Sequence, residues 1–122
     1  MTSTELNTQL NNAIGAHGAW KLRLRMAAQT PGGNDMSATA GDHRNCEFGR
    51  WLESLPADTK SMPEAQDTIA LHAAFHQTAG RTAQLVHQGK KDAAITMLDT
   101  ELADASNALK SAVSKWKFAA NQ

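Results

Sequence analysis

Apolar residues recur at alternating steps of three and four positions along much of this sequence, which places them on one face of an α-helix. The first stripe predicts a helix over residues 4–28. Thr2 and Glu5 have the spacing of a capping box, in which each side chain accepts a hydrogen bond from the other residue's backbone N–H. His17 falls on this stripe, so we expect its side chain to face the core. The stripe consists of Leu6, Leu10, Ile14, His17, Lys21, Leu24 and Ala28, and Trp20 beside the lysine continues it.

Two further stripes predict two long helices in the second half of the chain. Ser61 and Glu64 have capping-box spacing, with Pro63 in the first turn, and Gly89 suits the position just after a helix C-terminus. One helix is therefore expected from this start to Gly89, and the other over residues 91–119. Their apolar faces are Ala65, Ile69, His72, His76, Ala79, Ala83 and Val86 in the first, and Ile95, Leu98, Leu102, Ala105, Leu109, Ala112 and Trp116 in the second.

The segment between the first two long helices is predicted to hold a loop and a short helix. Residues 29–41 are rich in Gly, Ser, Thr and Pro, which is typical of a loop. At about 13 residues this loop is longer than most connections in bundles, and we expect it to cover part of a functional site. A short helix is predicted over residues 47–55. Its apolar positions are Phe48, Trp51, Leu52 and Leu55.

Seven-residue periodicity sustained over long helices favours packing at shallow crossing angles. We therefore predict an all-α fold, an antiparallel four-helix-type bundle with an additional short helix. The sequence has no tyrosine and few β-branched residues, which also favours helices over strands. It contains no internal repeat, and 122 residues suit one core, so residues 1–122 are expected to form a single domain.

Charge and hydropathy exclude several classes of partner. Twelve basic residues balance twelve acidic ones, which gives no electrostatic reason to bind nucleic acid or anionic lipid. No segment approaches the roughly 18–20 consecutive apolar residues that a membrane-spanning helix needs. The first ten residues also lack the basic and apolar regions of a secretory signal. We expect a cytoplasmic protein that does not insert into membranes.

His72 and His76 are the strongest local indication of chemistry. Residues four apart on a helix are neighbours, with Cβ atoms about 5–6 Å apart, so both imidazoles can reach one metal ion. Both occupy consecutive positions of an apolar face, where a bundle normally places leucine. Two buried polar rings are costly unless hydrogen bonds or a ligand satisfy them. A pair of hydrogen-bonded core histidines is the alternative interpretation.

His17 and Cys46 complete a set of four candidate ligands. His17 lies on the core-facing stripe of the first helix, and Cys46, the one cysteine, is expected at the N-terminal edge of the short helix. There the helix dipole favours a thiolate. Three histidines and one cysteine match the tetrahedral coordination that zinc prefers. We predict that His17, Cys46, His72 and His76 bind one Zn²⁺.

The remaining two histidines fit this site less well. His43 lies near Cys46 in a polar stretch and could compete as a ligand, but it is second choice to His17 because it does not fall on a core stripe. His87 lies three turns beyond His76, about 16 Å along the helix, too far to share one metal ion. At the end of its helix it would interact with the local dipole.

Two other metal chemistries are disfavoured by the residues around these histidines. A zinc hydrolase of the His-Glu-x-x-His type places its general base directly after the first histidine, where this chain has Ala73. A di-iron bundle requires inward glutamates and Glu-x-x-His sets, which the stripes do not contain. We therefore do not expect an enzyme. A purely structural zinc site uses the same ligands and stays open as an alternative.

The stretch Cys46-Glu-Phe-Gly49-Arg-Trp51-Leu, preceded by His17 and followed by His72 and His76, resembles the chemoreceptor zinc-binding (CZB) domain family. This family has a Cys-x-x-Gly-x-Trp stretch and a His, Cys, His, His ligand set. The resemblance makes Gly49 and Trp51 structural motif positions. Many members have an aliphatic residue next to the cysteine, whereas this chain has Glu47 and then Phe48, which could alter access to the sulfur.

The resemblance also implies a role in bacterial signal transduction and chemotaxis. Such domains are usually attached to chemoreceptors or to enzymes that synthesise cyclic di-GMP, and they often form homodimers. They are thought to sense zinc availability or oxidants such as hypochlorous acid, with the zinc-bound cysteine, here Cys46, as the redox-sensitive residue. Two interpretations of the aromatic residues Trp20, Trp116 and Phe118 stay open: they mark a dimer interface, or they cap the core.

Overall fold

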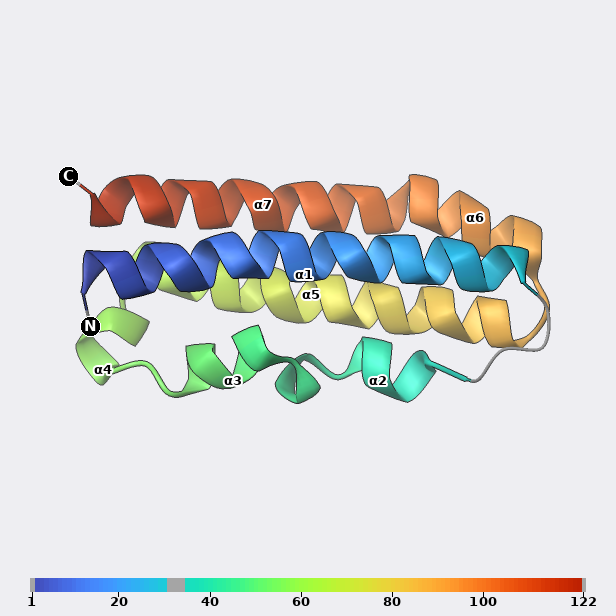
Figure 1. Cartoon of the computed structure of the whole chain (residues 1–122), viewed down its shortest axis with the longest axis horizontal. Helices are drawn as coiled ribbons and strands as arrows, with labels where there is room; N and C mark the ends of the chain where they lie inside the picture. Colours follow the sequence, from blue (N-terminus) through green and yellow to red (C-terminus); the bar gives the residue numbers. More distant parts are fainter. Residues whose placement is uncertain (1, 31–34, 122) are drawn as a thin grey trace.

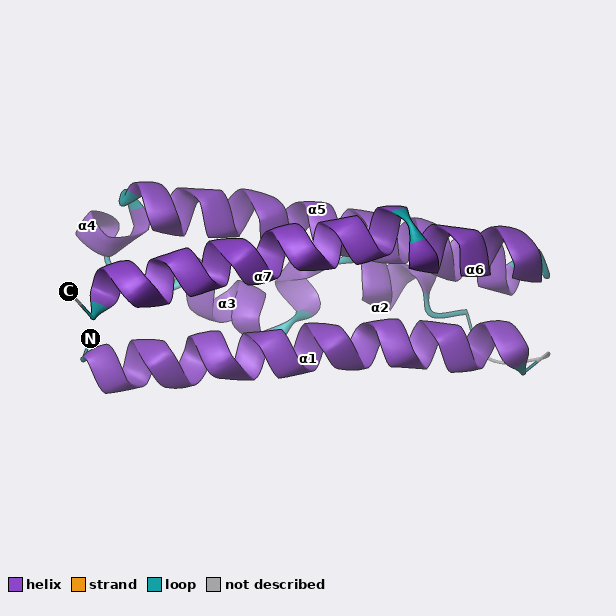
Figure 2. Cartoon of the chain, turned by 90° about the horizontal axis from the view of Figure 1, so that it is seen from above, coloured by secondary structure: helices purple, strands orange, loops and turns teal. Residues whose placement is uncertain are grey.

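The computed structural model describes residues 2–30 and 35–121, and these form helices joined by short connections, with no strand among them. Three long helices lie side by side, and the shorter α6 continues the line of α7 (Figure 1). Viewed from above, α7 lies between α1 and α5 (Figure 2). These helices are α1 (Ser3–Gln29), α5 (Pro63–His87), α6 (Lys91–Asp99) and α7 (Glu101–Ala120).

A row of short helices takes the place of a fourth long helix. It runs along one side of α1 and α5 in the direction opposite to both (Figure 1). The chain therefore passes up α1, down the row, up α5 and down α6 and α7, and the predicted all-α antiparallel bundle is confirmed. The row consists of α2 (Ser37–Gly41), the 3₁₀ turn η1 (His43–Asn45), α3 (Glu47–Glu53) and α4 (Ala57–Lys60).

Helix α1 begins and packs as its sequence predicts. The Thr2 hydroxyl accepts from the backbone N–H of Glu5 at 3.1 Å, and the Glu5 carboxylate accepts from Thr2 N–H at 3.3 Å. This capping box satisfies two of the four unpaired N–H groups at the start of the helix. Leu6, Leu10 and Leu24 of the predicted stripe are buried.

The two ends of α5 differ in how well they were predicted. A capping box at Ser61 is wrong: the Ser61 hydroxyl donates to the carbonyl of Asp58 at 3.0 Å, and the helix begins at Pro63. Proline suits this first position because it has no N–H to leave unpaired. The end at Gly89 is confirmed, with a φ of 76° and two N–H groups, from Gly89 and Lys90, that close the last turn as a Schellman motif.

The single helix predicted over residues 91–119 is wrong, because the chain breaks into α6 and α7 at Thr100 (φ −117°, ψ −87°). The Thr100 hydroxyl donates to the carbonyl of Thr96 at 2.7 Å. A side-chain hydrogen bond of this kind competes with helical geometry and bends helices. The apolar face continues through the break, since Leu98 and Leu102 are both buried.

The loop predicted over residues 29–41 is wrong at both of its ends. Gln29 closes α1, and Ser37–Gly41 form α2, whereas residues 31–34 lie outside the described residues. The Asp35 carboxylate accepts from the backbone N–H of Ser37 at 2.9 Å and so starts the first turn of α2. The short helix predicted over residues 47–55 is α3, which ends two residues earlier, at Glu53.

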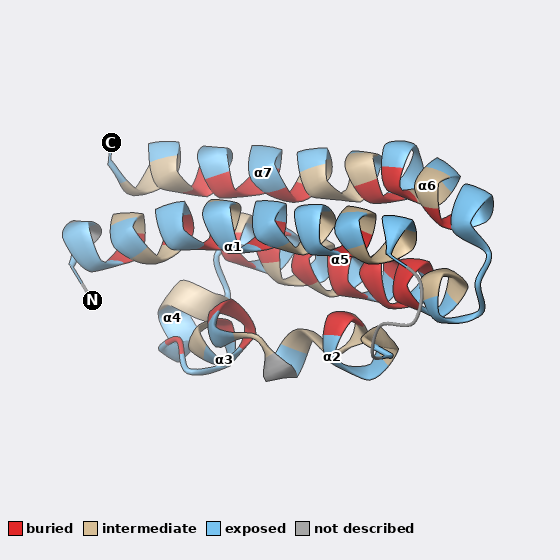
Figure 3. Cartoon of the chain, turned by 45° about the vertical axis from the view of Figure 1, so that its right-hand side comes forward, coloured by how far each residue is buried: buried red, intermediate tan, exposed pale blue. Residues whose placement is uncertain are grey.

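The core lies along the inward faces of the long helices, where buried positions form continuous bands (Figure 3). Trp116 is 0% exposed, so it belongs to this core, and the interpretation that places it at a dimer interface is wrong. Phe118 is 70% exposed and Trp20 is half-buried, with the Arg23 guanidinium 4.2 Å from the Trp20 ring centroid. The largest wholly buried apolar side chains are Trp116, Phe75, Leu10, Leu24, Leu102 and Val113.

None of the described helices combines the length and the apolar character that a membrane span requires.

Candidate metal centre

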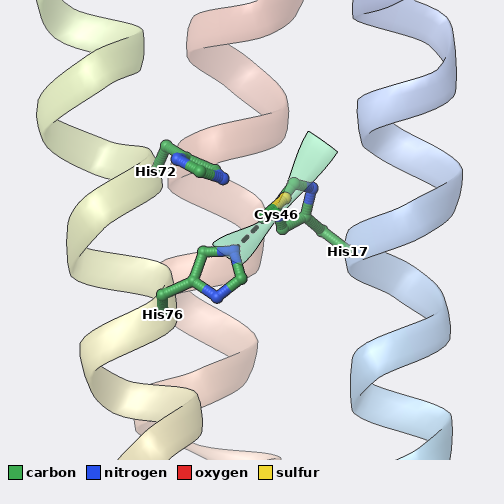
Figure 4. A group of neighbouring side chains, drawn as sticks. All are labelled: His17, Cys46, His72 and His76. Atoms are coloured by element: carbon green, nitrogen blue, oxygen red, sulfur yellow. Dashed lines mark hydrogen bonds between the residues drawn. The ribbon is translucent and has the colours of Figure 1, made fainter. Parts of the chain in front are cut away.

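The bundle brings together four side chains from three separate elements. His17 comes from the middle of α1, and His72 and His76 come from successive turns of α5. Cys46 is the N-cap residue of α3 (Figure 4). One possible ligand atom from each residue lies within 4.8 Å of the other three. All three histidines are buried, whereas Cys46 is half-buried. The residues predicted as a set are therefore neighbours in space.

Two histidines are oriented by backbone carbonyl groups. The Nδ1 atom of His17 lies 2.6 Å from the carbonyl oxygen of Ala13, and Nδ1 of His76 lies 2.8 Å from that of Ala40. A carbonyl oxygen can only accept, so in both neutral rings Nδ1 is the protonated nitrogen and donates. The lone pair is then on Nε2, which faces the centre of the cluster. Such carbonyl partners orient metal-binding histidines in many proteins.

Two of the distances at the centre are close to those of a tetrahedral zinc ion. The Nε2 atoms of His17 and His76 lie 3.2 Å apart (the dashed line in Figure 4), and the Cys46 sulfur lies 3.8 Å from Nε2 of His17. Zinc bonds of about 2.05 Å to nitrogen and 2.3 Å to sulfur place tetrahedral ligands about 3.3 Å (N···N) and 3.6 Å (N···S) apart. Two nitrogens with lone pairs cannot hydrogen-bond to each other, so a shared cation explains their closeness.

His72 supplies a further indication of a ligand. Its Nε2 atom is buried and has no hydrogen-bond partner among the described residues. An unsatisfied buried nitrogen of this kind costs about 1–3 kcal/mol. Its ring is 4.6 Å from that of His76 and 4.8 Å from that of His17, centroid to centroid. A metal ion bound at the centre of the cluster would satisfy it.

The histidines of the cluster are neutral at physiological pH. Burial, opposed by the hydrogen bond to Ala13, lowers the pKa of His17 to about 4, and burial together with the neighbouring histidines lowers that of His72 to about 2. Burial also lowers the pKa of His76, although its hydrogen bond to Ala40 opposes the shift. A neutral imidazole presents the lone pair that a metal needs. The cluster contains no carboxylate, and this donor set of imidazoles and a thiol suits zinc.

A glycine lets the cysteine segment approach the histidines. A side chain at Gly49 would collide with the carbonyl oxygen of His43, and its Cβ would lie 3.2 Å from Cε1 of His72. Two residues later, the Trp51 ring stacks on Phe48 with centroids 5.6 Å apart and lies 5.7 Å from Trp116. The glycine thus permits close packing on η1 and α5, and the tryptophan fixes α3 to the core.

The other two histidines lie outside the cluster. The ring centroid of His43 is 6.2 Å from that of His72. His87 is the last residue of α5, and its Nε2 atom lies 3.9 Å from the carboxylate of Asp35.

Residues 17–83 match the family described as the chemoreceptor zinc-binding domain. The chain belongs to this family. The matched region is more than half of the chain, and it begins at His17 and includes Cys46, His72 and His76. The family resemblance seen in the Cys46-x-x-Gly49-x-Trp51 stretch is thereby confirmed, and zinc is the metal that a CZB domain binds. No curated protein and no solved structure matches the chain significantly.

The sequence did not reveal the carbonyl groups around this CZB site. Every residue has a carbonyl, so nothing in the sequence distinguishes Ala13 or Ala40 from other alanines. Gly80, in the middle of a long helix, was the one available indication. A glycine costs about 1 kcal/mol there relative to alanine, and such a position commonly marks a close approach of two backbones.

Proposed function

We propose that this chain is a regulatory zinc sensor of bacterial signalling, in which His17, Cys46, His72 and His76 hold one Zn²⁺. The observation that supports this proposal is the convergence of one donor atom from each residue within 4.8 Å, with no carboxylate among them. A closed set of four ligands leaves no open position for a substrate, unlike a catalytic zinc site. A regulatory module, rather than an enzyme, is the function that such a site suits.

Metal analysis tests the ligand set directly. Protein purified without added metal is expected to contain about one zinc per chain, with X-ray absorption showing one sulfur and three nitrogen scatterers. Cys46→Ala should remove the sulfur scatterer, whereas His87→Ala should change neither the stoichiometry nor the spectrum. A spectrum of nitrogen and oxygen scatterers alone in the unmodified chain contradicts the assignment of Cys46.

Within this function, we propose Cys46 as the redox-sensitive ligand. Cys46 is a half-buried residue, while the three histidines are 1–3% exposed, so Cys46 is the most accessible residue of the four to a small oxidant. Zinc requires the thiolate, which is also the form that oxidants attack. The thiolate takes up the oxygen of hypochlorous acid and releases chloride, giving a sulfenic acid that binds zinc more weakly.

Loss of the sulfur ligand would free a specific segment. Cys46 is the N-cap of α3, a helix of seven residues, and its side chain makes no capping hydrogen bond. The bond to zinc then restrains the start of α3 in addition to the packing of Phe48 and Trp51 against the core. Oxidation therefore releases residues 42–55, whose movement alters the surface offered to an output domain of the chemoreceptor or cyclic di-GMP-synthesising type.

An oxidation experiment tests this switch. The zinc-loaded chain is treated with sub-stoichiometric hypochlorous acid, Cys46 is followed by mass spectrometry, and residues 42–55 by amide hydrogen exchange. Faster exchange in that segment after oxidation is expected, with Cys46→Ala unresponsive as the control. If Cys46 is oxidised and exchange stays unchanged, the zinc site is structural.

The alternative function is a structural zinc site in a cytoplasmic dimerisation bundle. Leu22 and Met26, four residues apart on α1, are 60% and 58% exposed, and Phe118 is 70% exposed. Large apolar side chains on a surface favour contact with another molecule. We propose a homodimer that uses the Leu22 and Met26 face, a feature compatible with the sensor and with the structural site.

A further inference from the structure

His43 lies beside the metal centre without belonging to it. Its ring centroid is 6.2 Å from that of His72, with the two planes at 88°. The two histidines line one pocket of about 180 Å³, whose other walls include Gly49, Glu53, Lys60 and Ile69. Glu53 is exposed, so the pocket connects the surface of the molecule with a wall of the buried cluster.

Of the three histidines, His72 is the one whose ring no hydrogen bond to a described residue orients. His17 and His76 each donate from Nδ1 to a backbone carbonyl, whereas no hydrogen bond from His72 to any described residue is present. Hydrogen-bond partners of this kind orient the ring of a metal-binding histidine, and their loss commonly weakens metal affinity 10- to 100-fold. His72 is therefore the histidine that can turn away from the metal most readily, and it is the one that faces the pocket.

A second pocket, which His17 of the cluster helps to line, suits a cation less well. It lies between α1 and α7 next to His17, has a volume of about 90 Å³, and is lined by Lys21 and Lys110 together with apolar side chains. Two ammonium groups repel a divalent cation. The pocket beside His43 is lined by one lysine and one glutamate, Lys60 and Glu53, so its side-chain charges are balanced, and Lys60 donates to the backbone carbonyl of Glu53 at 3.3 Å.

We propose that the pocket lined by His43 and His72 is the route by which zinc enters and leaves, with His43 as a transient ligand. This inference rests on the proposed zinc site. A closed site of four ligands exchanges its metal slowly unless an additional donor can take the place of one ligand as it departs. The imidazole of His43 is such a donor. Its ring is next to that of His72, the histidine that no hydrogen bond orients.

The position of His43 is fixed by its backbone. The missing side chain of Gly49 leaves room for the His43 carbonyl group against α3, and the 3₁₀ turn begins with the Asp42 carboxylate accepting from the N–H of Arg44 at 3.0 Å. His43 is thereby held at the pocket whether or not its ring contacts a metal ion.

The test measures exchange rates together with equilibrium affinity. Zinc-loaded protein is mixed with an excess of a chromogenic chelator to give the release rate. Zinc is added to metal-free protein to give the loading rate, and competition gives Kd. For His43→Ala, both rates are expected to fall about tenfold, equivalent to a barrier raised by about 1.4 kcal/mol, while Kd stays constant. His87→Ala, a histidine outside the pocket, should exchange like the unmodified chain.

A second pair of variants tests the pocket itself. Ile69→Phe adds volume to a pocket wall and should slow release and loading together. Ile95→Phe makes the same change to a half-buried residue of α6, away from the pocket, and should leave both rates unchanged.

Unchanged rates in both His43→Ala and Ile69→Phe overturn the route. Faster release with a raised Kd in His43→Ala also overturns it, because His43 then supports the bound state. Absence of bound zinc in the unmodified chain instead overturns the proposed zinc site, and the route with it.

Discussion

Gly41 at the end of α2 lies directly against Gly80 in the middle of α5. A methyl group added to Gly80 would lie 2.8 Å from the Cα of Gly41, closer than two such carbon atoms can pack. The contact brings α2 onto α5, where the carbonyl of Ala40 accepts from Nδ1 of His76 at 2.8 Å. Two glycines without metal-binding groups thus determine how one candidate zinc ligand is oriented.

Gly80→Ala is expected to weaken zinc binding without unfolding the bundle. The added methyl group displaces α2 and lengthens the hydrogen bond from His76 to Ala40, and loss of such an outer partner raises the zinc Kd about 10- to 100-fold. Alanine also favours a helix by about 1 kcal/mol over glycine, so α5 itself should not melt. Chelator competition measures Kd, and far-UV circular dichroism measures helix content.

A matched control for this variant is Gly15→Ala. Apart from the neighbouring residues and backbone of its own helix, no described atom lies within 4 Å of the position that its methyl group would occupy, so the change should leave the zinc Kd as it is. The free energy of unfolding should rise by up to about 1 kcal/mol. Equal zinc affinity in the two variants would show that the approach of Gly41 to Gly80 does not orient His76.

The fold was predictable where apolar residues repeat along a helix. It was less predictable where contacts between distant segments determine whether a helix forms. The stripes of α1 and α5 place His17, His72 and His76 inward because each histidine is in line with apolar residues that form the core. In contrast, Ser37–Gly41 contain no large apolar residue, and α2 forms because it packs on α5 through Gly41. The inward position of the three histidines followed from periodicity and that of Cys46 from its expected place at a helix edge, whereas the carbonyl of Ala40 could not be predicted from the sequence.

The proposed homodimer is tested by measuring the mass of the unmodified chain and of variants in its exposed apolar face, Leu22 and Met26. The chain is expected to have twice its monomer mass of 13.1 kDa by light scattering at micromolar concentration. Replacing both Leu22 and Met26 by lysine should give the monomer mass, because charged groups at the centre of an interface lose their hydration on association. Phe118→Lys is the control for a general effect of removing exposed apolar area. A monomer mass for the unmodified chain contradicts the dimer.

The pH dependence of stability in the metal-free protein follows from the buried histidines. Burial holds the pKa of His17 at about 4 and that of His72 at about 2, against 6.5 in an unfolded chain. Below pH 6.5 the unfolded state therefore binds more protons, and the free energy of unfolding falls with pH, down to about pH 4 for His17 and lower for His72. Urea unfolding should show a loss of up to about 2 kcal/mol per histidine between pH 7 and pH 5. His72→Leu should have a shallower slope, and an equal slope would contradict this account.

Removal of zinc is expected to lower the melting temperature while leaving most of the helix content intact. The proposed ligands lie on α1, at the start of α3 and on α5, so a metal bound by them would join three elements that are distant in sequence. The core does not depend on it, since Leu10, Leu24, Leu102 and Trp116 are wholly buried and none is a ligand. A zinc finger, whose core is too small to fold alone, unfolds when its metal is removed.

Circular dichroism with and without a chelator should therefore show a lower transition temperature and a similar helical signal before the transition. Hydrogen exchange should increase mainly in residues 42–55, because α3 is a helix of only seven residues and Cys46 at its start is released from the metal. Complete loss of the helical signal on chelation would show instead that the metal is part of the folding core.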